Sequence, residues 1–186
     1  MKNLQERLDD LRALVCHPDF LAGRGLSNEV NIRFFCYTPH EEPTVTHFLR
    51  QLQKDATENF CPVIHDLYRI FLDACADLGI LEEIPAMEEE RGRDFLRAQL
   101  HAAVGEPAFI ERIAPENLTR GREVLILTGV GDVFPFLRVH TLLAALQPHI
   151  TDIPILVMYP GTFDGYRLRL FDHLAPSDYY RAFNIV

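Results

Sequence analysis

The first half of the chain carries apolar residues at spacings typical of alternating helices and strands. Leucine and valine recur at helical spacing over residues 3–15, which predicts an amphipathic N-terminal helix. Residues 30–37 are rich in aromatic and β-branched side chains and predict a first strand. Apolar positions after Pro43 predict a second helix, because proline suits the first turn of a helix. Residues 61–67 and 68–78 then predict a short strand followed by a helix.

The middle of the chain is polar and interrupts this pattern. The charged cluster from Glu88 to Asp94 predicts a solvated helix face or turn rather than a binding tail. Helical spacing resumes at Phe95, and Pro107 and Pro115 bracket a further short helix. The middle of the chain therefore predicts further helices but no clear catalytic or binding site.

The last third of the chain gives the clearest indication of the fold. Residues 124–128 and 153–159 are apolar without alternation, as in strands of a parallel sheet that is covered on both faces. Apolar residues at helical spacing lie between them and predict a helix that ends near Pro148. The stretch 122–159 is therefore a strand–helix–strand unit. We expect its two strands to be parallel and central, with the strand at 30–37 in the same sheet.

Together these elements predict a three-layer α/β domain with a mainly parallel sheet flanked by helices. The core is of the P-loop or Rossmann type but lacks a Walker A motif, since G-x-x-x-x-G-K-[ST] is absent from the chain. The 186 residues, 48% of them hydrophobic, are enough for one domain spanning 1–186 to bury a core without disulfides or metals.

Composition narrows the classes of function. The formal net charge of -9 argues against strong direct binding to DNA, which requires clustered lysine and arginine. The four cysteines form no C-x-x-C pair, so we expect reduced thiols in a cytoplasmic protein rather than zinc ligands. No segment approaches the roughly 20 apolar residues of a membrane span, and the N-terminus lacks a signal-peptide pattern. We therefore expect no membrane association.

The turn after the strand at 124–128 is the strongest candidate for ligand chemistry. Gly129, Gly131 and Asp132 stand where strand would meet helix, and helix N-termini in such folds favour anions. The signal is weak, because a third glycine at dinucleotide spacing is missing and Asp132 puts a carboxylate where a phosphate would sit. We interpret these residues as a structural turn with Asp132 as the helix N-cap, and we expect no cofactor.

A second loop carries strong turn signals. Tyr159 and Gly161 flank a proline, Asp164 precedes another glycine, and Arg167 follows shortly after. Pro-Gly and Asp-Gly both favour turns. The pattern predicts a structured connection at the same sheet edge as the first glycine turn, or alternatively a surface that binds another protein.

The C-terminal segment gives two interpretations. Tyr179, Tyr180, Arg181 and Phe183 include residue types that are enriched at protein interfaces. The same segment can be a terminal edge strand with alternating burial. The residues alone leave both interpretations open.

The titratable residues form no convincing catalytic or metal-binding set. The eight histidines are scattered, and none belongs to an H-E-x-x-H motif. His65 and Asp66 are adjacent but lack a nucleophile that would complete a hydrolytic triad. A nuclease would need clustered carboxylates with a nearby lysine, and the chain has only Lys2 and Lys54, far in sequence from Asp132. We therefore predict no catalytic residue and no metal ligand.

Three segments support a resemblance to a known family. They are VLILTGVGDVFPFLRVH, VMYPGTFDG and the terminal YYRAF. They resemble the BrxB family, the B component of the BREX phage-defence systems, and the strand FFCYTP and the N-terminal helix fit as well. The family consists of small cytoplasmic proteins encoded beside a large ATPase, a DNA methyltransferase and the alkaline-phosphatase-superfamily protein PglZ. The resemblance implies a non-catalytic adaptor in BREX antiviral defence that binds other BREX proteins, with PglZ as the first candidate.

Three functions can be told apart by surface features. An adaptor predicts a flat, partly apolar patch that includes Tyr179 or Tyr180. A nucleotide sensor without hydrolysis predicts a deep pocket lined by Gly129 and Gly161. A hydrolase acting on DNA predicts a strongly positive groove.

Overall fold

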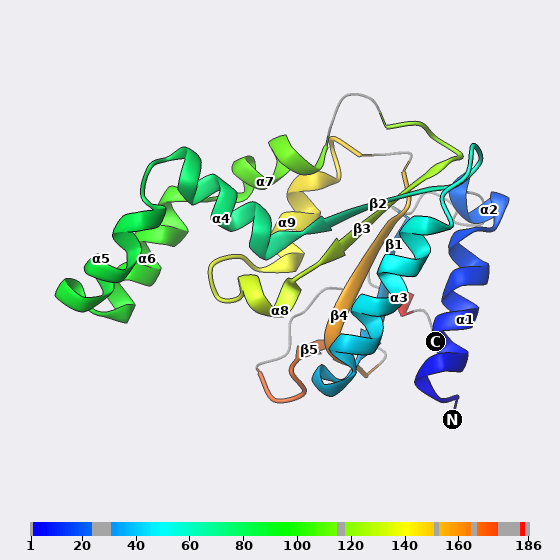
Figure 1. Ribbon diagram of the computed structural model, residues 1–186, viewed down its shortest axis with the longest axis horizontal. Helices are drawn as coiled ribbons and strands as arrows, with labels where there is room; N and C mark the ends of the chain where they lie inside the picture. Colours follow the sequence, from blue (N-terminus) through cyan, green and yellow to red (C-terminus); the bar gives the residue numbers. More distant parts are fainter. Residues whose placement is uncertain are drawn as a thin grey trace.

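The described part of the chain has the predicted three-layer α/β architecture, with a sheet between two layers of helices (Figure 1). The structure is a computed structural model. It describes residues 2–23, 31–114, 118–150, 153–164, 167–174 and 183–184.

A parallel sheet forms the middle layer. Its strand order is β2-β3-β4-β1-β6, and each neighbouring pair in this order is parallel. The expectations that the segments 124–128 and 153–159 are parallel and central, and that 30–37 joins the same sheet, are confirmed. The strands are β1 (Ile32–Tyr37), β2 (Cys61–Asp66), β3 (Glu123–Thr128), β4 (Ile155–Phe163) and β6 (Phe183–Asn184).

The central strands lack polar alternation because both of their faces are buried. On β3, Leu125 and Leu127 belong to one core cluster, whereas Val124 and Ile126 belong to a second cluster on the opposite face. All four side chains are fully buried. The burial of both faces is the physical reason why such strands read as continuous apolar runs.

One face of the sheet is covered by the N-terminal helices α1 (Leu4–Val15), α2 (Pro18–Leu21) and α3 (Glu42–Lys54). The predicted helix at 3–15 is thus confirmed within one residue. Asn3 caps α1 in a capping box with Glu6, which satisfies backbone N–H groups at the start of the helix.

The other face is covered by α4 (Leu67–Asp77), α7 (Glu106–Ile113), α8 (Val130–Val133) and α9 (Val139–Leu146). The sequence predicts a single helix between β3 and β4, but the structure has two. Phe136 lies in a turn between α8 and α9 instead of in a helix. The end of α9 at Leu146 agrees with the stop predicted near Pro148.

The polar middle of the chain forms a helical arm beside the sheet (Figure 1). The arm consists of a 3-10 turn (Leu81–Glu83), α5 (Ile84–Arg91) and α6 (Arg93–Ala103). The charged cluster from Glu88 to Asp94 is exposed, as predicted, and α5 contributes no buried residue to the core. Helix α6, in contrast, contributes Leu96 and Leu100 to the core.

The end of β4 departs from the prediction. Pro160 and Gly161 carry turn signals, yet β4 continues through them to Phe163 and pairs with the antiparallel strand β5 (Leu168–Leu170). Beyond Phe163, the carboxylate of Asp164 accepts a hydrogen bond from the backbone N–H of Arg167 (2.7 Å). None of the helices described is long and apolar enough to cross a membrane.

Candidate functional site

The carboxyl ends of the parallel strands form the edge where open α/β sheets bind ligands. Two adjoining cavities of about 210 and 380 Å³ open there. Both are lined by Glu42, Gly129 and Asp132, and the larger one also by Asp66. We call this region the carboxyl-edge cleft.

Gly129 is a packing residue in this cleft. It follows β3 in the left-handed region, with φ +68°, and a Cβ at this position would overlap the carboxylate of Asp66. That carboxylate caps α4, because its Oδ1 accepts hydrogen bonds from the backbone N–H groups of Tyr68 (2.9 Å) and Arg69 (3.2 Å). The space beside the glycine turn is therefore occupied by a carboxylate of the protein itself.

Asp132 is not the N-cap that the sequence predicts. The cap position of α8 is Gly129, without a side-chain hydrogen bond, and Asp132 lies inside this four-residue helix with its side chain exposed. Asp66 performs the capping role at the neighbouring helix α4 instead. Gly129 stands at the bend between β3 and α8, whereas Gly131 and Asp132 lie inside α8, so the predicted cap at Asp132 is wrong.

Gly131 and Gly161 permit close packing of the β4–β5 hairpin. A Cβ on Gly131 would lie 2.6 Å from the Phe171 ring, and a Cβ on Gly161 would overlap the carbonyl oxygen of Arg169. The backbone N–H of Phe171 also donates to the carbonyl of Pro160 (2.9 Å). The ring of Phe171 therefore lies against the glycine turn and closes the smaller cavity on that side.

The electrostatics of the cleft oppose an anionic ligand. Glu42, Asp66 and Asp132 contribute three carboxylates, and Arg50 is the cation among the lining residues of the two cavities. The Tyr37 hydroxyl donates to Glu42 Oε2 (2.5 Å). Burial first, and then Glu42 and Asp132, raise the pKa of Tyr37 well above its usual range, so the phenol stays protonated.

Among the described residues, neither a reactive thiol nor a metal-binding cluster is found near the cleft. Burial raises the pKa of Cys36 to about 12, which keeps its thiol protonated and unreactive at neutral pH. The described residues contain no group of three or more histidine, cysteine or acidic side chains that could hold a metal ion.

The predicted interaction residues divide into three groups. Tyr159 is 3% exposed and its ring packs edge-on against Phe34, and Gly161 is buried as well, so neither can contact a partner directly. Asp164 and Arg167 are exposed at the tip of the β4–β5 hairpin. Tyr179, Tyr180 and Arg181 lie outside the described residues.

Sequence reasoning missed Asp66, Glu42 and Phe171 as parts of the cleft. A signal for Asp66 was available, because an aspartate directly before a predicted helix is a typical N-cap. No local signal identifies Phe171, which reaches the glycine turn from 40 positions further along the chain.

Comparison with known proteins gives a consistent result. The family profile described as BREX protein BrxB matches residues 63–185. A BREX protein BrxB from Bacillus cereus (strain H3081.97) is 30% identical over 100% of this chain and 99% of its own length. A BREX protein BrxB from Escherichia coli O9:H4 (strain HS) is 28% identical over 98% of this chain and 92% of its own length. No solved structure matches the chain.

Proposed function

Because this chain belongs to the BrxB family of BREX proteins, we propose that it is a non-catalytic interaction component of a BREX antiviral defence complex. Family membership makes it a BREX component with a role in phage defence. The adaptor role and the identity of its partner are the parts that we propose.

A non-catalytic role is supported by the side chains of the protein itself that lie against the glycine turn in the carboxyl-edge cleft. A nucleotide-binding α/β protein leaves backbone N–H groups free for phosphate at this edge. Here Asp66 occupies the space beside Gly129, and Phe171 lies against Gly131. This arrangement disfavours the nucleotide-sensing alternative. The cleft is lined by Glu42, Asp66 and Asp132, so it is not the strongly positive groove that a hydrolase acting on DNA predicts.

We propose PglZ as the partner and the cytoplasm as the location, as the family resemblance implies. The contact surface predicted from the sequence is the sheet edge carrying Tyr159–Asp164 and Arg167, together with the terminal segment 179–183. Within it, Asp164 and Arg167 are accessible. Arginine is among the residue types that dominate binding energy at interfaces.

Binding of purified PglZ to the purified chain tests this proposal. We expect Arg167→Glu to weaken binding by roughly 30-fold, corresponding to about 2 kcal/mol for an interface arginine. Arg120→Glu is the matched control, because Arg120 is an exposed arginine just before β3 at the opposite end of the sheet. If wild type binds neither PglZ nor any other BREX protein, the adaptor function is wrong.

A second measurement tests the non-catalytic part. We expect no phosphate release from ATP with magnesium. Turnover by wild type that disappears in Asp132→Ala would contradict the proposal, because it would assign a catalytic role to the carboxyl-edge cleft.

A further inference from the structure

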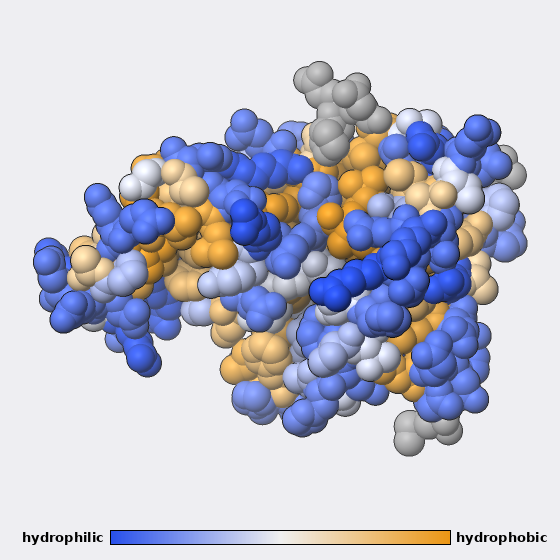
Figure 2. All heavy atoms as spheres, viewed as in Figure 1, coloured by the Kyte–Doolittle hydropathy of each residue, from blue (hydrophilic) through white to orange (hydrophobic). Residues whose placement is uncertain are grey.

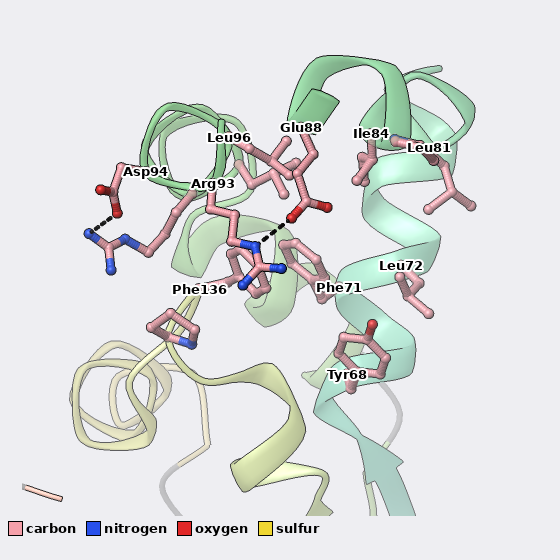
Figure 3. A pocket seen from close by; sticks show the side chains of 14 residues that line it. Tyr68, Phe71, Leu72, Leu81, Ile84, Glu88, Arg93, Asp94, Leu96 and Phe136 are labelled. Atoms are coloured by element: carbon pink, nitrogen blue, oxygen red, sulfur yellow. Dashed lines mark hydrogen bonds and ion pairs between the residues drawn. The ribbon is translucent and has the colours of Figure 1, made fainter. Parts of the chain in front are cut away.

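An apolar groove lies between α4 and the helical arm, away from the carboxyl-edge cleft (Figure 3). It has a volume of about 560 Å³. Its walls come from α4, from α5 and α6 of the arm, and from the turn between α8 and α9. The apolar lining includes Tyr68, Phe71, Leu72, Ile84, Leu96 and Phe136.

The floor of the groove is an aromatic surface fixed by the core. Phe71 and Phe136 stack with ring centroids 4.7 Å apart, and Tyr68 stacks on Phe71 at 6.3 Å. Phe71 is buried, whereas Tyr68 is 38% exposed on the groove side. Figure 2 shows apolar residues gathered on the visible surface between the arm and the sheet. Among the lining residues, Tyr68 is the large apolar side chain that is exposed.

The charged lining residues lie at the mouth and pair with one another. Arg93 Nε lies 3.0 Å from Glu88 Oε1, and Arg97 lies 3.4 Å from Asp94. Arg93 and Asp94 are almost fully exposed, so these ion pairs remain solvated. The groove thus has an apolar floor and a polar rim, which is the arrangement of protein interfaces. Small-molecule sites instead place a few polar groups inside the pocket.

The arm gives the surroundings of the groove a negative charge. Residues 81–103 of the arm contain six acidic residues and three arginines, a formal charge of -3. Glu82, Glu83, Glu89 and Glu90 are all exposed. A partner with lysine or arginine beside its apolar contact residues would therefore be attracted and oriented by this field.

We infer that this groove receives the apolar face of an amphipathic helix from a partner protein, with basic residues flanking that face. The shape of the groove suits a helix, because helices form most of its walls and an added helix can place residues i, i+3, i+4 and i+7 on the floor. The inference rests on the proposed adaptor function and names the chemistry of the partner segment.

Two exposed residues at the two ends of α4 provide a matched test. Tyr68 lies in the first turn of α4 and Leu78 is its C-cap residue; their side chains are 38% and 55% exposed, and Tyr68 lines the groove whereas Leu78 does not. We expect Tyr68→Ala to weaken binding to the BREX partner by roughly 30-fold and Leu78→Ala to stay within about twofold of wild type. Circular dichroism of both variants checks that they are folded before their binding is compared.

The charge of the arm is tested separately. The double variant Glu89→Lys, Glu90→Lys should slow association and reduce its dependence on salt, because attraction of a basic segment is lost. The control is Asp9→Lys, Asp10→Lys, an adjacent exposed pair on α1 at the other face of the sheet. Unchanged or faster association of the arm variant would overturn the basic character of the partner segment.

Cross-linking tests directly which protein segment binds in the groove. A photoreactive phenylalanine analogue is placed at position 68, or at position 78 as control, in cells that carry the complete BREX system. We expect position 68 to capture a helical peptide of another BREX protein with apolar residues three and four apart and flanking lysine or arginine. Capture of a second copy of this chain, capture of an acidic segment, or no product specific to position 68 would overturn the inference.

The binding results separate the two proposals. If wild type binds a BREX protein and Tyr68→Ala binds equally well, the groove inference is wrong and the adaptor function stands. If wild type binds no BREX protein, the adaptor function is wrong, and the inference that rests on it is wrong as well.

Discussion

The carboxyl-edge cleft and the apolar groove beside the arm differ in how the protein's own side chains line them. In the cleft, the protein's own groups lie against the glycine turn: Asp66 beside Gly129 and Phe171 beside Gly131. In the groove, Tyr68 and Leu72 line an open apolar surface that the described residues leave uncovered. The glycines of the conspicuous sequence motif thus serve internal packing, whereas the groove, which carries no motif, is the region where we propose that a partner binds.

This difference has a physical basis. Asp66 has hydrogen-bond partners inside the molecule, so a ligand that displaced it would leave backbone N–H groups of α4 unsatisfied. Covering the apolar floor of the groove would instead remove exposed apolar area from water, which is favourable. Mutations in the cleft should therefore reduce stability, and mutations of exposed residues in the groove should reduce binding.

The largest effect on stability is expected at Gly129. Gly129→Ala should lower the free energy of unfolding by about 3 kcal/mol, because left-handed backbone costs an alanine about 1–2 kcal/mol and the overlap with Asp66 adds a packing penalty. Gly121→Ala is the control, since Gly121 has φ +81° but nothing within 4 Å of its Cβ position. Urea denaturation should show a loss of only about 1–2 kcal/mol for this control. Equal losses in the two variants would contradict the packing of Asp66 against the turn.

Much of the fold could be predicted because its signals are local. The apolar runs of β3 and β4 and the helical spacing of α1 depend only on neighbouring residues. The continuation of β4 through Pro160 and Gly161 could not be predicted, because pairing with β5 overrides the local turn signal. The sequence therefore predicts a turn where the structure has a strand.

The candidate sites were harder to predict than the fold. Phe171 contacts Gly131, which lies 40 positions earlier in the sequence. Phe136 stacks on Phe71, which lies 65 positions earlier, in the floor of the groove. Tyr159 is predicted as an interaction residue from its place beside the Pro-Gly turn signal, but only the structure shows it buried against Phe34. Residue type and spacing predict elements well, whereas which side chains remain exposed is decided by contacts between distant segments.

A smaller effect separates the two aspartates at the cleft. Asp66→Ala should lower the free energy of unfolding by about 1 kcal/mol, because it removes the cap of α4. Asp132→Ala should change it by less than about 0.5 kcal/mol, since Asp132 is exposed and caps no helix. Urea denaturation of the two single variants measures both values. A larger loss for Asp132→Ala than for Asp66→Ala would restore the assignment predicted from the sequence.

The smallest effect is a pH dependence that originates next to Asp66. His65 is half-buried on β2, its Nε2 has no hydrogen-bond partner among the described residues, and burial lowers its pKa. The unfolded chain therefore binds a proton at a higher pH than the folded protein does. Protonation of His65 therefore favours the unfolded chain. The free energy of unfolding has its full value above the unfolded pKa of about 6.5 and decreases as the pH falls below it. Burial also lowers the pKa of His140 on α9, which adds a dependence of the same sign.

Urea denaturation at pH 7.5 and 5.5 tests this prediction. Wild type should be less stable at the lower pH, and His65→Gln should reduce the difference because glutamine does not titrate in this range. The double variant His65→Gln, His140→Gln should reduce it further. If His65→Gln keeps the full wild-type difference while His140→Gln removes it, the titrating group lies on α9 and not beside the carboxyl-edge cleft. Binding through the groove should respond differently, because Phe71, Phe136 and the aliphatic side chains that line it carry no titratable group. A pH-induced loss of binding that exceeds the loss of folded protein would place a titrating group in the interface and would break the distinction between the two regions.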